Sequence, residues 1–202
     1  PPALFRKLAR GLIDSNMGIA WTTHMRFEKS LLEDQVWQDA KESGCKYLHF
    51  GYESGNERVL KLMDKATTTA IMTEHLKRTA EAGIWNHCMG FFGFPGETRE
   101  EAWSSVQFLE QNKDYVHSLG FGTFDLGRHN PVAKHPEKFG VTAYKNPEWD
   151  LALDYYFTVK QGLSIEEAER VFEEFERNHN PGWDLRLTVA GVRELAVPLA
   201  DR

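Results

Sequence analysis

The chain has 202 residues, of which 41% are hydrophobic and 12% aromatic, and its formal net charge is −6. This length and composition suit one domain, or one domain with part of a second. The negative charge disfavours nonspecific binding to nucleic acid or to an anionic membrane surface. The sequence shows neither a leader segment nor an apolar run near the ~20 residues of a membrane span, so we expect a cytoplasmic protein.

The start of the chain and its two cysteines carry further information. The opening stretch "PPALFRKLARGLIDS" has no initiator Met, and its apolar residues recur at helical spacing. We therefore expect a segment of a longer protein that begins within an amphipathic helix. Cys45 and Cys88 are too few for a disulfide framework or a four-thiolate metal site, and we interpret both as small buried hydrophobic residues.

From residue 17 to residue 126, predicted strands alternate with predicted helices. Strands are expected at residues 17–22, 46–52, 85–92 and 117–126. Capping-box sequences at 30–33, 54–57 and 98–101 open helices that end near residues 44, 63 and 112, and a further helix is expected at 69–82. The alternation predicts a parallel sheet with helical crossovers, of the α/β class. Without a GxGxxG or phosphate-loop motif, a partial (β/α) barrel fits better than a dinucleotide-binding sheet.

The character of the chain changes after residue 130. A proline-containing, irregular stretch is followed by predicted helices at about 149–161, 164–178 and 183–199, the second of which opens with another capping box. We therefore expect two parts: the barrel portion at residues 1–145 and an α-helical extension at residues 146–202.

Polar residues gather where the predicted strands end, which is where parallel sheets bind their ligands. Glu53 stands at the junction of a strand and a helix, although Glu57 already supplies negative charge to the first turn of that helix. We interpret Glu53 as a ligand-binding residue. The adjacent Ser54 is a candidate ligand too, but its spacing to Glu57 favours a role as the helix cap.

Two stretches, "HFGYESGNERVLKLMDK" and "AGIWNHCMGFFGFPGETREE", resemble the fourth and fifth strand–helix units of radical S-adenosylmethionine (radical SAM) enzymes. They are most similar to the group often found with a cobalamin-binding domain. The stretches "IAWTTHMRFEKSLLEDQVWQDAKESGCKYL" and "TFDLGRHNPVAKHPEKFGV" resemble the third unit and the sixth strand, so the resemblance covers roughly residues 1–145. It implies a partial (β/α)6 barrel that binds S-adenosylmethionine and an unidentified small-molecule substrate.

The same resemblance implies a reaction and exposes a departure from the family. A [4Fe-4S] cluster reduces the sulfonium of S-adenosylmethionine to give a 5'-deoxyadenosyl radical, and a parent that carries the cobalamin domain also uses cobalamin for methyl transfer. The family's CxxxCxxC triplet is not in this sequence, and Cys45 and Cys88 have the wrong spacing for it. We therefore expect a fragment that lacks the cluster site, is inactive alone, and stays colourless after anaerobic reconstitution.

The resemblance also suggests roles for individual residues. Glu53 would accept hydrogen bonds from the ammonium group or the ribose hydroxyls of S-adenosylmethionine, and Arg26 would hold its carboxylate. The alternative for Arg26 is an ion pair with Glu28. Four further residues would let the adenine approach the backbone closely or, alternatively, form a tight turn that Glu97 supports: Gly90, Gly93, Pro95 and Gly96.

Two other classes of function remain open from the sequence. Inward-facing histidines in the barrel would suit a metal-dependent hydrolase, and the candidates are His24, His49, His87 and His117. Their spacing follows no metal motif, so core or outward-facing positions are the simpler interpretation. A non-enzymatic interaction module would use the apolar residues of the tail, Phe172, Phe175 and Trp183, although such positions more often belong to a core.

We also expect the chain to associate. The predicted strand at residues 17–22, "MGIAWT", has neither a charge nor a proline to protect an exposed edge. If the part of the chain that precedes it is missing, the edge should pair with a second copy and shield Trp21.

Overall fold

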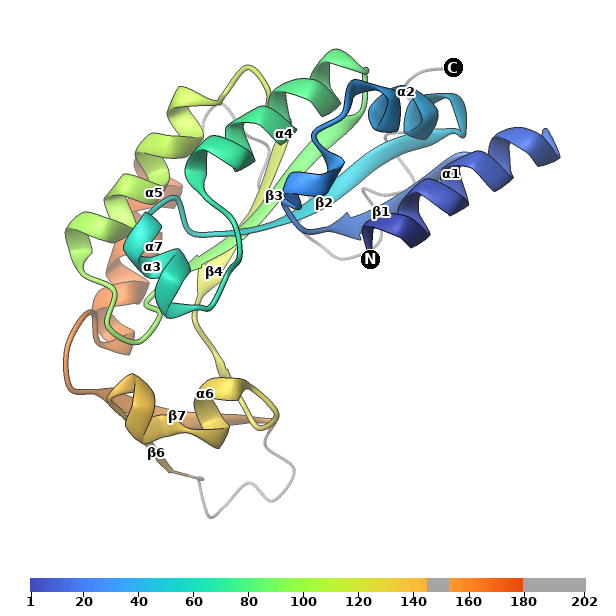
Figure 1. Ribbon diagram of the computed structural model, residues 1–202. Helices are drawn as coiled ribbons and strands as arrows, with labels where there is room; N and C mark the ends of the chain where they lie inside the picture. The colour runs from blue at the N-terminus through green and yellow to red at the C-terminus, as the bar shows by residue number, and fades with distance from the viewer. Residues whose placement is uncertain (145–152, 180–202) are drawn as a thin grey trace.

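The computed structural model describes residues 1–144 and 153–179 (Figure 1). In chain order, its elements are α1 (Pro2–Ser15), β1 (Trp21–Met25), the 3-10 turn η1 (Lys29–Leu31), α2 (Asp34–Glu42), β2 (Cys45–Glu53), α3 (Glu57–Leu62), α4 (Thr69–Glu81), β3 (Trp85–Phe92), α5 (Arg99–Gln111), β4 (Ser118–Thr123), β5 (Leu126–Gly127), α6 (Pro131–Lys134), η2 (Pro136–Phe139), β6 (Val141–Tyr144), β7 (Asp154–Val159) and α7 (Ile165–His179).

The main sheet has four parallel strands in the order β1-β2-β3-β4, which is also their order in the sequence. Helices α2, α4 and α5 lie along one face of this sheet (Figure 1). Each strand therefore pairs with the strand before it, and a helix crosses over between them, as in the wall of a (β/α) barrel. The predicted fold class, a partial barrel of parallel strands with helical crossovers, is confirmed.

The alternation of side chains along β2 gives the sheet two different faces. Leu48, Phe50 and Tyr52 are fully buried in the main hydrophobic core with residues of the covering helices. Since successive side chains of a strand point to opposite faces, His49 lies on the other face; the irregular pairing after Gly51 interrupts this alternation before Glu53. The helices thus bury the apolar face of β2, and His49 lies on the face that would line a barrel.

The first strand begins later than the sequence predicts. β1 covers Trp21–Met25 rather than residues 17–22, and Met17 and Ile19 are exposed. Gly18 has a φ of +61°, a left-handed conformation that interrupts an extended strand. In the described part of the chain β1 is the last strand on its side of the sheet, so association through this edge stays a prediction.

The capping boxes have mixed outcomes. Thr98 and Glu101 form a reciprocal box at the start of α5, as predicted. Ser30 instead lies in η1, and α2 begins at Asp34 after Glu33, which makes no side-chain cap bond. The helix prediction was right, but its start was wrong, because a 3-10 turn takes up the residues of the apparent box.

Beyond β4, a small antiparallel sheet forms in the order β5-β7-β6. The helix predicted at 149–161 is wrong, because residues 154–159 form β7; its side chains alternate between exposed Tyr156 and buried Phe157, which is strand periodicity. The predicted strand at 117–126 is divided between β4 and β5. This small sheet joins residues on both sides of the predicted domain boundary at 145 and 146.

The helix predicted at 164–178 is confirmed as α7, which packs against β3, β4 and α5. Phe175 is fully buried in the main core and Phe172 packs against it, so these two residues belong to the core rather than to an interaction surface. Trp183 and the helix predicted at 183–199 lie outside the described residues.

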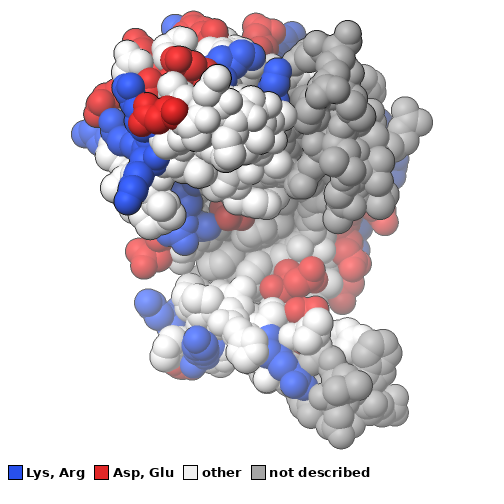
Figure 2. Space-filling view, turned by 90° about the vertical axis from the view of Figure 1, so that its right-hand side faces the viewer, with Lys and Arg blue, Asp and Glu red and all other residues white. Residues whose placement is uncertain are grey.

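Two surface properties complete the fold. None of the helices in residues 1–144 and 153–179 has the length and apolarity that a bilayer span requires. On the face drawn in Figure 2, basic and acidic side chains are intermingled over the upper part, and a group of acidic side chains lies lower down.

Candidate functional site

The candidate site lies at the carboxyl end of β2 and β3. Glu53 is the last residue of β2 and pairs in register with Gly90 of β3, after an irregularity in the pairing that follows Gly51. Its backbone φ is +61°, a left-handed conformation that is uncommon for a residue with a side chain. A strained residue at the end of a parallel strand is typical of a functional position.

The Glu53 carboxylate forms an ion pair with Lys65. The Lys65 Nζ atom lies 2.8 Å from Glu53 Oε1, and the two side chains are 34% and 22% exposed, respectively. Both side chains are therefore partly accessible to solvent. Lys65 is the last residue of the stretch "HFGYESGNERVLKLMDK", but the sequence alone gave it no role, because nothing local indicates that it meets Glu53.

Ser54 does not cap the helix that follows it. Its hydroxyl is fully buried and lies 3.0 Å from the Ser105 hydroxyl of α5. The cap of α3 is Asn56, whose side-chain oxygen accepts hydrogen bonds from the backbone N–H groups of Arg58 and Val59. The prediction of Ser54 as a cap was wrong by two residues. Its predicted role as a ligand gains no support from this buried position.

A glycine-rich turn follows β3. Gly93 and Gly96 have φ values of +87° and +90°, which glycine adopts without the strain of a Cβ atom. A Cβ on Gly93 would lie 2.5 Å from the Cβ of Ala168 in α7, so this glycine also permits close packing of α7. Pro95, between the two glycines, is buried. The turn is therefore fixed by backbone geometry and by packing.

Glu97 holds this turn from within. Its Oε2 atom accepts a hydrogen bond of 2.6 Å from the Gly93 backbone N–H, and its side chain is fully buried. Burial raises the pKa of the Glu97 carboxyl to about 7; the hydrogen bond from the Gly93 N–H opposes this rise, and nearby Glu101 adds to it. The predicted role of Glu97 as a support of the turn is confirmed by this bond.

Arg58 connects the turn to helix α3. Its guanidinium donates a 2.6 Å hydrogen bond to the Gly96 carbonyl oxygen and forms an ion pair with Glu101 of α5. Helix α3 and the residues just after it thus contact both halves of the site: Arg58 contacts the glycine turn, and Lys65 contacts Glu53. Sequence reasoning did not single out Arg58, whose partners are distant in the chain.

Gly90 has a packing role. A Cβ atom there would lie 2.7 Å from Cζ of Phe121 and 3.0 Å from Cδ1 of Tyr52. Both aromatic rings are therefore able to close over the backbone of β3 only because position 90 has no side chain.

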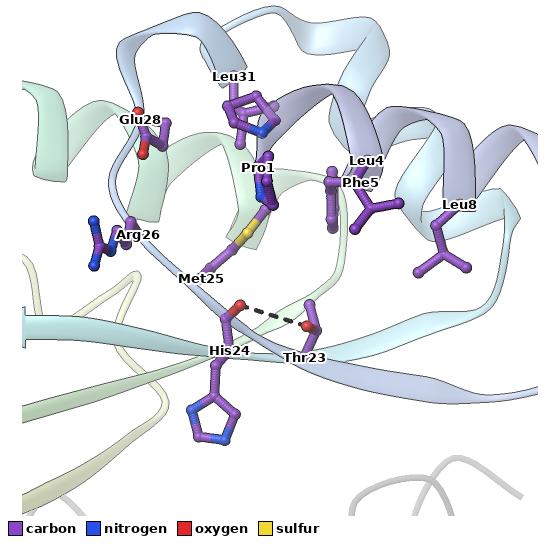
Figure 3. A pocket seen from close by; sticks show the side chains of 11 residues that line it. Pro1, Leu4, Phe5, Leu8, Thr23, His24, Met25, Arg26, Glu28 and Leu31 are labelled. Atoms are coloured by element: carbon purple, nitrogen blue, oxygen red, sulfur yellow. Dashed lines mark hydrogen bonds between the residues drawn. The ribbon is translucent and has the colours of Figure 1, made fainter.

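Arg26 is exposed and follows the end of β1. It lines a pocket of about 370 Å³ between α1 and β1, mostly with apolar side chains. Leu4 and Phe5 project into this pocket from α1, while the imidazole of His24 lies on the opposite side of the strand (Figure 3). Neither Glu53 nor the glycine turn lines the pocket. Arg26 and Glu53 both lie at the carboxyl ends of parallel strands, but the pocket that Arg26 lines does not include Glu53.

Three of the four candidate histidines form a row. His24, His49 and His87 are paired in register across β1, β2 and β3, with ring centroids 4.6 Å apart for His24 and His49 and 5.3 Å apart for His49 and His87. His117 lies outside the row and stacks on Trp85. In the two described ranges, no group of three or more His, Cys, Asp or Glu residues is arranged to hold a metal ion.

Both cysteines are fully buried. Burial raises the pKa of the Cys45 thiol to about 12 and raises that of Cys88 well above its ordinary value. Thiolates are the ligands of iron–sulfur clusters, so these two side chains do not fit a cluster. The interpretation of both as small buried residues is confirmed.

Known proteins resemble this chain in sequence and in fold. The family model described as the Radical SAM superfamily matches residues 3–109. The uncharacterized methyltransferase PH0819 of Pyrococcus horikoshii is 32% identical over 97 residues, which are 47% of this chain and 20% of that protein. The cytidylyl-2-hydroxyethylphosphonate methyltransferase of Streptomyces wedmorensis is 26% identical over 183 residues, 85% of this chain and 33% of that protein.

A solved structure shares the fold. The radical S-adenosylmethionine methyltransferase TsrM of Kitasatospora setae, with cobalamin and a [4Fe-4S] cluster bound, aligns with a TM-score of 0.57 and 16% identity, over 85% of this chain and 34% of that one. The chain therefore spans between a fifth and about a third of the length of these proteins.

Proposed function

Because this chain belongs to the radical SAM superfamily, we propose that it forms the S-adenosylmethionine-binding and substrate-facing wall of a group-transferring enzyme. The family assignment confirms the resemblance seen in the two strand–helix stretches of the sequence. The role of this wall and the reaction of the whole protein are our proposal.

The observation that carries the proposal is the position of Glu53. A partly exposed carboxylate ends a parallel strand in a left-handed backbone conformation, in register with Gly90 of β3. Such a carboxylate is a strong acceptor for the ammonium or hydroxyl donors of S-adenosylmethionine. The turn at Gly93 and Gly96 would lie against the adenine of S-adenosylmethionine. Arg26, which follows β1, would bind the carboxylate of the same cofactor.

In this proposal the cofactors divide between this chain and the rest of the protein. S-adenosylmethionine supplies an activated methyl group and, together with a reduced iron–sulfur cluster, radical chemistry. Since Cys45 and Cys88 do not fit a cluster, residues outside this sequence would supply its ligands. Glu53 would hold S-adenosylmethionine, and the glycine turn would lie close to it.

We further propose methyl transfer to a small molecule as the reaction. The support is that both relatives described above are named methyltransferases. The structure of TsrM, which shares the fold, contains cobalamin, and we propose cobalamin as a second cofactor of the whole protein.

Substitution of Glu53 tests the proposal in the intact protein that contains this chain. Glu53→Gln keeps the size of the side chain but removes its charge, so we expect the affinity for S-adenosylmethionine to fall by ~1.5–3 kcal/mol, the usual value of a hydrogen bond to a charged group. Titration calorimetry measures this difference. The matched control is Glu42→Gln at the exposed end of α2, which should bind normally. Unchanged affinity in Glu53→Gln would refute the proposed contact.

A further inference from the structure

We infer that Lys65 is a positioning residue for Glu53: it holds one carboxylate oxygen so that the other is presented to the cofactor. This inference rests on the proposed function, in which Glu53 binds S-adenosylmethionine. It concerns Lys65, which ends the stretch that resembles the family but was given no role there.

The backbone conformation at the end of helix α3 directs Lys65 toward the end of β2. The backbone N–H of Lys65 donates to the Leu60 carbonyl oxygen at 2.9 Å, and the N–H of Asp64 donates to the Lys61 carbonyl oxygen at 3.1 Å. These two bonds form a Schellman motif, which requires a left-handed residue between them. Asp64 supplies it with a φ of +56°, where glycine is usual. The chain therefore turns back at Asp64 and brings Lys65 to the end of β2.

The partner of Lys65 is in the same unusual conformation. In residues 1–144 and 153–179, the only non-glycine residues with positive φ are Asn16, Glu53 and Asp64. Asn16 caps the end of α1. Asp64 likewise ends α3, directly before Lys65 in the chain. Glu53 is the one of the three that ends a strand, and it forms the ion pair with Lys65. Strained residues persist where the surrounding structure over-determines them, and they gather at functional sites.

The geometry of the Lys65–Glu53 ion pair suits a role in orienting the carboxylate better than a role in stabilising the fold. Lys65 contacts Oε1 of Glu53 at 2.8 Å, and the Glu53 side chain keeps 22% of its surface exposed. An ion pair with this much exposure contributes little to folding. It does limit the rotamers of the carboxylate, and a carboxylate ordered before binding loses less freedom when the ligand arrives. Lys65 thus acts on the cofactor through Glu53.

The test is a binding measurement on the intact protein that contains this chain, with S-adenosylhomocysteine as a non-reacting probe. We expect Lys65→Met to weaken binding about three- to tenfold, the cost of ordering one free side chain. Lys65→Arg keeps a cation beside Glu53, so its affinity should fall less than that of Lys65→Met. The matched control is Lys61→Met, which removes an exposed lysine from helix α3, just before Lys65 in the chain, and should change nothing. Melting temperatures should be similar for all variants.

A double-mutant cycle separates positioning from the other possibilities. If Lys65 acts through Glu53, Lys65→Met should have no effect in a Glu53→Gln background. An equal loss in both backgrounds would overturn the inference, because Lys65 would then contact the ligand itself. Normal binding by Lys65→Met, alongside weak binding by Glu53→Gln, would overturn the inference and leave the proposed function intact. Normal binding by Glu53→Gln would overturn the proposed function and the inference with it.

Discussion

The buried carboxyl of Glu97 should make the stability of this protein depend on pH near neutrality. The group is fully buried, and burial raises its pKa from 4.5 to about 7. The folded state therefore holds the proton more tightly than the unfolded state does. The stability that results is fully present below pH 4.5 and is lost as the pH rises through about 7.

The substitution Glu97→Gln isolates this contribution. At ~1.36 kcal/mol per pKa unit, the difference between 4.5 and about 7 corresponds to a loss of up to about 3 kcal/mol. The glutamine oxygen can still accept the hydrogen bond from the Gly93 N–H, but the side chain does not ionise. We expect the variant and the parent to have similar free energies of unfolding near pH 4.5, and the variant to be the more stable by about 2–3 kcal/mol near pH 8.

Urea unfolding of both proteins across this pH range is the assay. The comparison must be a difference, because His75 acts in the opposite sense: burial lowers its pKa from 6.5 to about 4, so its contribution is lost as the pH falls. Both proteins contain His75, and its effect cancels. A difference in stability that stays constant between pH 4.5 and pH 8 would refute the reasoning.

Two further predictions concern backbone positions at the site. Gly90→Ala should destabilise the fold by ~1–3 kcal/mol in urea unfolding, because its Cβ would lie 2.7 Å from the Phe121 ring; unchanged stability would mean that the ring moves freely. Asp64→Gly should stabilise by ~0.5–1 kcal/mol, because glycine adopts the φ of +56° without steric cost. Thermal unfolding checks the second change, and a lower melting temperature would contradict it.

The sequence alone was sufficient for the central α/β unit. β3 and the neighbouring elements β2, α4 and α5 lie where their apolar periodicity and their end signals predict. These signals are local, since a helix cap or a terminating glycine acts within one or two turns. Glu53 could be singled out for a related reason, because a carboxylate at a strand end has little local use once Glu57 charges the helix.

Tertiary structure decided the features that depend on distant residues. The strand at 154–159 exists because it pairs with β5 and β6, which lie earlier in the chain, whereas its local composition also suited a helix. The cap of α3 is Asn56 rather than Ser54, because the Ser54 hydroxyl is bonded to Ser105 in α5. Lys65 meets Glu53 only because Asp64 turns the chain back. Contacts of this kind join residues that have no fixed spacing in the sequence, so periodicity and capping patterns carry no record of them.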